Sequence, residues 1–198
     1  MGKGRLEAFS DGVLAIIITI MVLEMKVPHG SSWGSLQPLI PVFFSYMLSF
    51  VNVAIYWNNH HHMLHASETV NAPVMWANIH LLFWLSLFPF VSGWMGENHF
   101  AAIPVAVYGA VSLMVGVAYY ILAQCLIRLH GKRSTLSLAI RKDKRGIISV
   151  VIDAIGIGLS FVHPWLGLGM YIVVAAMWFI PDKRIEEKMV EKEVIKDG

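Results

Sequence analysis

Six apolar runs, each long enough or nearly long enough to cross a lipid bilayer, occupy most of this 198-residue chain. They cover residues 5–27, 37–60, 73–95, 101–127, 147–162 and 165–180, with turns expected at residues 93–96 and at His163-Pro164. A bilayer core about 30 Å thick requires about 20 residues of α-helix. Lipid offers no hydrogen-bond partner to the backbone, which favours helices over open strands. We therefore expect an all-α membrane protein with six transmembrane helices.

The composition agrees with a membrane class and excludes several others. Hydrophobic residues make up 57% of the chain and charged residues 14%, against about 45–50% and about 25% in soluble domains. A soluble enzyme would need more polar surface than this chain can supply. The net charge of +2 gives no case for binding nucleic acid. We expect one six-helix domain over residues 1–181 and a charged cytoplasmic tail over residues 182–198.

The basic residues predict the orientation. Fourteen of the 15 lie at or before the start of the first run, between the fourth and fifth runs, or in the tail, and Lys26 alone lies on the opposite side. An even number of spans places both termini on one side of the membrane. Lysine and arginine accumulate in cytoplasmic segments, so both termini are expected to be cytoplasmic.

Polar residues inside the runs are informative because each is costly at membrane depth. Asp11 lies near the start of the first run, Asn78 and His80 lie within the third, and Asp153 lies within the fifth. For Asp153, pairing with a basic residue at the interface is favoured over a proton relay. The first run also has an uncharged face at helical spacing. Periodicity leaves open whether this face meets protein, lipid or a pore; it comprises Gly12, Ile16, Thr19, Ile20 and Leu23.

Histidines at the end of the second run invite a metal hypothesis. His61 and His65 are four residues apart and share one helical face, as metal-binding pairs do. No H-E-x-x-H arrangement is present, and a structural role is favoured for the cluster at residues 60–65. The signatures of hydrolases, P-loops and dinucleotide-binding folds are also missing, so we expect neither an enzyme nor a bound cofactor.

The first helix carries a motif that resembles a known family. Arg5, followed by Phe9, Ser10 and Asp11, forms an R-x-x-x-F-S-D sequence at the start of a membrane helix. It is similar to the signature of the endosomal/lysosomal potassium channel family, in its prokaryotic, single-repeat branch. The resemblance continues through Tyr56-Trp57 with the histidines after it, and through residues 78–93.

The resemblance implies a homotetramer in the plasma membrane of a prokaryote, with the first helix of each subunit lining a central pore. It implies a potassium-preferring cation channel that has no re-entrant filter loop and passes K⁺ or other monovalent cations. By position, Ile16 matches the hydrophobic constriction and Thr19 the threonine that contributes to potassium preference. Leu23 and Ile20 are expected to line the next layers.

The motif residues Arg5, Phe9, Ser10 and Asp11 are implied to hold the cytoplasmic end of the first helix, with Asn78 and His80 as expected partners. Two alternatives stay open at this point. One is a proton-coupled transporter that uses Asp11, His80 and Asp153. The other is a metal-ion transporter or metalloenzyme centred on His60–His65.

Overall fold

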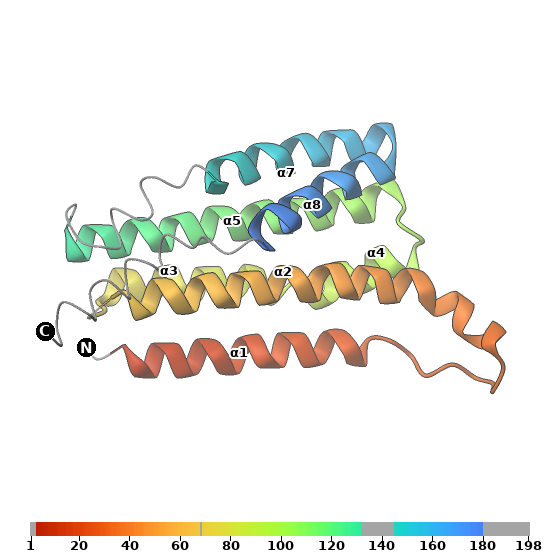
Figure 1. The fold of residues 1–198 in the computed structure, drawn as a ribbon, viewed down its shortest axis with the longest axis horizontal. Helices are drawn as coiled ribbons and strands as arrows, with labels where there is room; N and C mark the ends of the chain where they lie inside the picture. The colour runs from red at the N-terminus through yellow and green to blue at the C-terminus, as the bar shows by residue number, and fades with distance from the viewer. Residues whose placement is uncertain (1–2, 68, 132–144, 180–198) are drawn as a thin grey trace, which may run out of the picture.

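The computed structural model describes residues 3–67, 69–131 and 145–179, and all its regular elements are helices. Long helices lie side by side along one axis, with α1 at one edge of the bundle and α7 and α8 towards the opposite edge (Figure 1). The elements are α1 (Gly4–Leu23), the 3₁₀ helix η1 (Trp33–Leu39), α2 (Ile40–His65), α3 (Ala72–Leu85), α4 (Phe88–Glu97), α5 (Ala102–His130), α7 (Arg145–Val162) and α8 (Pro164–Phe179).

Local sequence explains several of these boundaries. The side chain of Asn71 accepts a hydrogen bond from the backbone N–H of Val74 at 3.1 Å and so caps α3. The expected break at His163-Pro164 is confirmed, because α7 ends at Val162 and α8 begins at Pro164. Proline disfavours helical backbone at the residue before it and suits the first turn of a new helix.

The third apolar run differs from the continuous helix that was expected. It is divided into α3 and α4 by a turn at Ser86-Leu87, with Pro89 in the first turn of α4. Proline has no N–H to continue the ladder, and its ring crowds the carbonyl four residues earlier, here that of Leu85.

The turn expected at residues 93–96 was also misplaced. Those residues belong to α4, and the chain turns at residues 98–101 instead. His99 and Phe100 adopt positive φ angles of 48° and 59° there.

Five helical stretches have the length and composition to cross a membrane: Gly4–Leu23, Trp33–His65, Ala72–Glu97, Ala102–His130 and Arg145–Val162. The helix Pro164–Phe179 is apolar but shorter. Helices α1, α3 and α7 begin at one end of the bundle, and helices α2, α5 and α8 end towards that same end (Figure 1). The basic segments expected at residues 132–144 and in the tail fall outside the described residues.

The core is centred on α5, which packs against α3, α4, α7 and α8. Its fully buried side chains include Tyr108, which meets Phe88 of α4 and Tyr171 of α8 edge-on or tilted. Helix α1 instead packs only along one side, against α2, α3 and α4. This peripheral position leaves much of its surface without a neighbour in the described part of the subunit.

Replacement of Gly96 by alanine is expected to lower the free energy of unfolding by about 1–3 kcal/mol. A Cβ at this position would lie 2.6 Å from the backbone Cα of Val42, so α4 and α2 would have to separate. Thermal unfolding of the purified protein in detergent measures the effect. Gly158→Ala is the control, because nothing lies within 4 Å of its Cβ position in α7. Equal stability of the two variants would contradict the close approach of α2 and α4.

Candidate functional site

Helix α1 has one buried side and one exposed side. The buried side consists of Leu6, Ser10, Leu14, Ile17 and Met21, spaced three or four residues apart. This spacing forms one continuous stripe on a helix. The stripe packs against α2, α3 and α4, and it fixes which way the rest of the helix points.

The exposed face of α1 is the uncharged face that the sequence picks out: Gly12, Ile16, Thr19, Ile20 and Leu23 are all exposed in the subunit. Ile16 is 58% exposed, Ile20 40% and Leu23 78%. Large apolar side chains gathered on one exposed surface usually meet lipid or another protein surface. The face therefore needs a partner outside the single subunit.

Thr19 is the one hydroxyl on this face. Its Oγ1 donates a hydrogen bond to the backbone carbonyl of Ile16 at 2.9 Å. A threonine hydroxyl has one proton and two acceptor lone pairs. Because the helix takes the proton, the lone pairs of Thr19 are turned to serve as acceptors for a cation or water.

A buried chain of polar groups, here called the polar chain, fixes the opposite side of α1. The imidazole Nε2 of His60 on α2 lies 2.7 Å from the amide oxygen of Asn78 on α3. The Asn78 amide donates to the Ser10 hydroxyl at 2.9 Å, and Ser10 donates to the carbonyl of Leu6 at 2.8 Å. His60, Asn78 and Ser10 are 3%, 0% and 0% exposed. Three helices are thus joined by one continuous set of buried hydrogen bonds.

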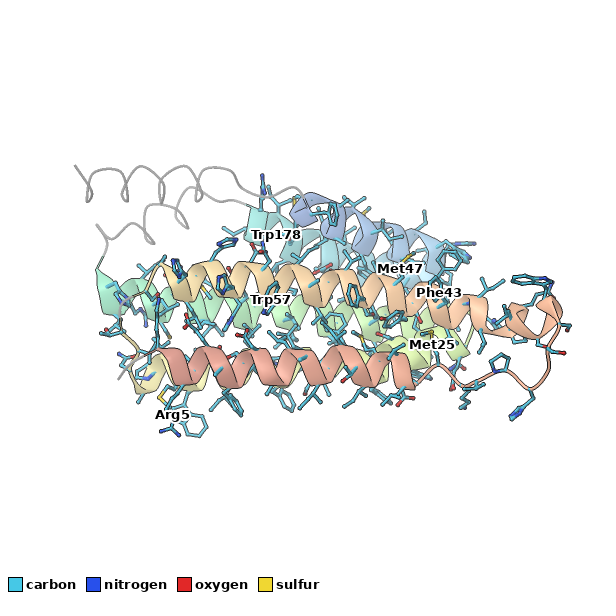
Figure 2. The ribbon with its side chains drawn as sticks, turned by 60° about the horizontal axis from the view of Figure 1, so that its bottom comes forward. Arg5, Met25, Phe43, Met47, Trp57 and Trp178 are labelled. Atoms are coloured by element: carbon cyan, nitrogen blue, oxygen red, sulfur yellow. The ribbon has the colours of Figure 1, made fainter. Side chains whose placement is uncertain are left out.

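Asp11 is held by a second contact on α2. The indole Nε1–H of Trp57 donates to Oδ1 of Asp11 at 2.9 Å. The Trp57 ring stacks on His61, with ring centroids 6.2 Å apart. Figure 2 shows Trp57 on α2 alongside α1. The motif residues Ser10 and Asp11 therefore contact different helices, one inside the core and one at its surface.

Lys3 adds a third attachment. Its ammonium group donates to the carbonyls of Leu64 at 3.1 Å and His65 at 3.0 Å, at the end of α2. Carbonyls in the last turn of a helix lack intrahelical donors, and a cation there also complements the helix dipole. The start of α1 is thereby tied to the end of α2.

Arg5 and Phe9 lie on the exposed side of α1, unlike the other two motif residues. Phe9 is 57% exposed, and Arg5 points away from α2 (Figure 2). Arg5 and Phe9 are thus not placed to hold α1 against the buried side of the subunit.

The two residues of α3 that were expected to contact the motif, Asn78 and His80, have different neighbours. Asn78 contacts Ser10, as described, whereas His80 accepts a hydrogen bond from Trp84 Nε1 at 2.9 Å. Asp153, on α7, accepts one from Ser112 at 3.4 Å rather than pairing with a basic side chain among the described residues. Asp11, His80 and Asp153 therefore have three separate sets of neighbours and form no shared site for coupled transport.

The histidine cluster separates into two faces. His61 and His65 stack with ring centroids 5.9 Å apart on the exposed side of α2, while His60 points into the polar chain. Residues 3–67, 69–131 and 145–179 contain no group of three or more His, Cys, Asp or Glu side chains placed to hold a metal ion.

Sequence reasoning missed His60, Trp57 and Lys3 as partners of α1. The signal available was weak: Trp57 and His60 are three residues apart and near the end of a membrane helix. Three consecutive histidines have the same chemistry, so only the rotation of α2 against α3 distinguishes His60 from its neighbours.

Comparisons with known proteins agree with the motif. Residues 5–89 match the family described as the endosomal/lysosomal potassium channel TMEM175. The chain is 54% identical over 191 residues to a potassium channel of Chryseobacterium sp. (strain P1-3), covering 96% of this chain and all of that protein. It is 35% identical over 85 residues to the human endosomal/lysosomal proton channel TMEM175, covering 36% of this chain and 17% of that protein.

A solved structure has the same arrangement of helices. The crystal structure of a lysosomal potassium-selective channel TMEM175 homolog from Chamaesiphon minutus superposes with a TM-score of 0.78 at 27% sequence identity. The match covers 90% of this chain and 96% of that chain.

Proposed function

The chain belongs to the TMEM175 potassium channel family, and from this premise we propose that it forms a potassium-preferring cation channel lined by α1. One observation carries the proposal: the exposed face of α1 is uncharged, bears one hydroxyl and has no partner among the described residues of the subunit. A face of this kind suits a narrow pore that conducts without a carbonyl-lined filter.

Four copies around a central axis are proposed to bring the four α1 faces together. A single subunit has no strongly polar stripe to line an aqueous route by itself. Closed rotational symmetry can enclose such a route between the four copies. Counting α3 and α4 as one crossing, we propose six crossings, of which the last is the shorter helix α8, about 24 Å long at 1.5 Å per residue. Both termini are proposed to be cytoplasmic, in the plasma membrane of a prokaryote, with residues 182–198 as a tail beyond the channel domain of residues 1–181.

Ile16 is proposed as the gate. A ring of four uncharged isoleucine side chains excludes water when narrow, and an ion cannot pass where its hydration shell is lost without replacement. The exposed fraction of 58% leaves the side chain free to meet its symmetry copies. Leu23 and Ile20 are proposed to line the next layers towards the outer end of α1.

Thr19 is proposed to provide the potassium preference. Its lone pairs face away from the helix, one turn beyond Ile16, and four copies supply four oxygens to a permeant ion. A carbonyl-lined filter offers more oxygens for each ion, so we expect a modest preference for K⁺ over other monovalent cations. No bound cofactor and no catalytic step enters this proposal.

The attachments on the other side of α1 are proposed to hold the pore in register. The polar chain and the Trp57–Asp11 contact fix the rotation of α1 about its own axis. A rotation of one residue, about 100°, would replace Ile16 at the axis by a neighbour.

Passive flux in liposomes tests the function. Purified protein in vesicles loaded with K⁺ is expected to release it down its gradient, with no coupled substrate and no imposed proton gradient. Vesicles without protein provide the control. Uphill accumulation of K⁺ driven by a proton gradient would contradict a channel and support a proton-coupled transporter.

Replacement of Thr19 by valine is expected to lower the K⁺ to Na⁺ permeability ratio to about 1. Valine keeps the branched shape but removes the one side-chain hydroxyl on the exposed face of α1. Reversal potentials under bi-ionic conditions give the ratio. Thr19→Ser is the matched control, since it keeps the hydroxyl; a ratio unchanged in Thr19→Val would exclude this residue as the source of selectivity.

A further inference from the structure

The end of α1 that is proposed to face outward carries a carboxylate where a helix favours a cation. Glu24 caps α1 through its backbone N–H, which donates to the carbonyl of Ile20 at 3.2 Å. The carboxyl end of a helix is the negative end of its dipole, so lysine or arginine is stabilising there and glutamate is not. The last turn of α1 has no basic residue. The charge of Glu24 and the negative end of the dipole therefore add together.

The carboxylate of Glu24 has no cationic partner in the part of the chain that the structure describes. Its side chain is exposed, and its Oε2 lies beside α4, 4.0 Å from the position that a Cβ would take at Gly93. Lys26, the nearest basic residue in the sequence, instead forms a salt bridge with Glu97 at 3.1 Å. That pair is neutral as a whole, so the charge of Glu24 is not cancelled.

The inner end of α1 bears the opposite charge on its exposed side. Arg5 precedes Gly12 by seven residues, which is nearly two full turns, so the two residues share one side of the helix. Arg5 is exposed, and within the described ranges it forms no salt bridge, not even with the nearby Glu7 or Asp11. The positive end of the helix dipole lies here as well. The charge along α1 thus changes from positive at Arg5 to negative at Glu24.

We propose that Glu24 determines the direction in which the channel conducts best. Four copies around the axis concentrate cations at the outer mouth, so inward K⁺ current exceeds outward current at low ionic strength. This inference rests on the proposed function, in which four α1 helices surround the pore. Rings of acidic side chains serve cation channels, and a mouth lined by one sign of charge raises the local concentration of the opposite ion. Arg5 has the reverse effect at the inner mouth, which makes the field asymmetric.

The position of Glu24 suits a long-range electrostatic effect rather than direct coordination of the ion. It lies five residues beyond Thr19, about 7.5 Å further along the helix, and its carboxylate rests against α4. An α-helix with its side chains is about 10–12 Å across, so the end of a pore-lining helix lies within about 10 Å of the axis. The Debye length is about 30 Å at 10 mM salt and about 3 Å at 1 M. The carboxylate therefore acts at the axis in dilute salt and is screened in concentrated salt.

Single-channel currents of the full-length protein in planar bilayers test the proposal. Symmetrical KCl solutions at 10 mM and at 1 M are compared, at voltages of both signs. In the wild type we expect inward current to exceed outward current by about threefold at 10 mM, and by less than about 1.2-fold at 1 M. Glu24→Gln is expected to lower the inward current at 10 mM by about threefold and to leave the current at 1 M unchanged. Glu24→Asp keeps the charge and is the matched control, expected to retain the wild-type inward current.

Glu24→Cys allows the charge to be changed in a channel that already conducts, so the test does not depend on the folding of Glu24→Gln. Membrane-impermeant methanethiosulfonate reagents add either a negative sulfonate or a positive trimethylammonium group. Applied from the outer side at 10 mM KCl, the sulfonate is expected to raise inward current and the ammonium group to lower it. The side that responds also gives the orientation of the channel. The wild type, whose single cysteine is Cys125, is the control and is expected not to respond.

Three results would overturn the proposal. One is equal inward and outward current in the wild type at 10 mM. Another is a Glu24→Gln current that is unchanged at 10 mM or reduced equally at both salt concentrations, and the third is the same response of Glu24→Cys to both reagents. In each case the wild type still conducts K⁺, so the proposed function stands. Absence of any K⁺ current in the wild type would instead contradict the proposed function, and this inference with it.

Discussion

Replacing Ile16 by asparagine is expected to raise potassium flux into reconstituted vesicles by about tenfold, equivalent to lowering the barrier by about 1.4 kcal/mol. Ile16 is 58% exposed, on a face of α1 that no other helix of the described structure covers. If four copies form the constriction, four amide groups would keep it hydrated and remove the dewetting barrier. Asparagine and isoleucine have similar lengths, so the substitution is expected to change the hydration of the constriction more than its width.

Two controls separate this effect from nonspecific disturbance. Ile16→Leu keeps an apolar ring and is expected to retain the low flux of the wild type. Ile155→Asn places the same polar side chain at a half-exposed isoleucine of α7. Unchanged flux in Ile16→Asn, or an equal increase in Ile155→Asn, would remove Ile16 as the gate.

Asn78→Leu is expected to lower the free energy of unfolding by about 2–4 kcal/mol. Leucine fills a similar volume but leaves the buried His60 ring nitrogen without its partner, and Ser10, which keeps its bond to the Leu6 carbonyl, loses the amide donor. A buried unsatisfied group costs about 1–3 kcal/mol. Denaturant or thermal unfolding in detergent measures the change. Flux is expected to fall as well, because α1 loses the contact that fixes its rotation.

Asn98→Leu is the matched control for Asn78→Leu. Asn98 is exposed, and its side chain donates to the carbonyl of Trp94 at 2.8 Å at the end of α4. Surface substitutions of this kind usually change stability by less than about 0.5 kcal/mol. A cost for Asn78→Leu no greater than that of the control would show that the polar chain contributes little.

The sequence was sufficient to predict the apolar helices and which residues of α1 share its uncharged face, but not that this face is exposed in the subunit. Both follow from composition and periodicity along a single segment: Ile16, Thr19 and Leu23 share a face whatever α1 packs against. The motif similarly placed Ser10 and Asp11 at one end of the helix. These are local properties, so the sequence of a single segment is enough to predict them.

The partners of α1 could be predicted only in part. Asn78 and His80 were both expected to meet the motif, yet residues two apart on a helix point to different faces, so one α3 surface cannot offer both. The choice between them depends on how α3 is rotated, which the short, almost uniformly apolar sequence of Ala72–Leu85 does not reveal. The interruption at Ser86-Leu87 was missed for a different reason, since Pro89 is compatible with either a kink or a new helix.

The attachments of α1 also have a mechanical consequence. Directional bonds hold its first turns, through Lys3, Ser10 and Asp11, and the salt bridge of Lys26 with Glu97 at 3.1 Å lies just beyond its other end. Between these ends the helix rests on Leu14, Ile17 and Met21, whose apolar contacts have no preferred direction. The segment that carries Ile16 is therefore held by directional bonds near its ends and only by apolar contacts along its middle. If α1 lines the pore as proposed, we expect small bending of this segment to change the pore width without breaking the hydrogen bonds of Lys3, Ser10 and Asp11.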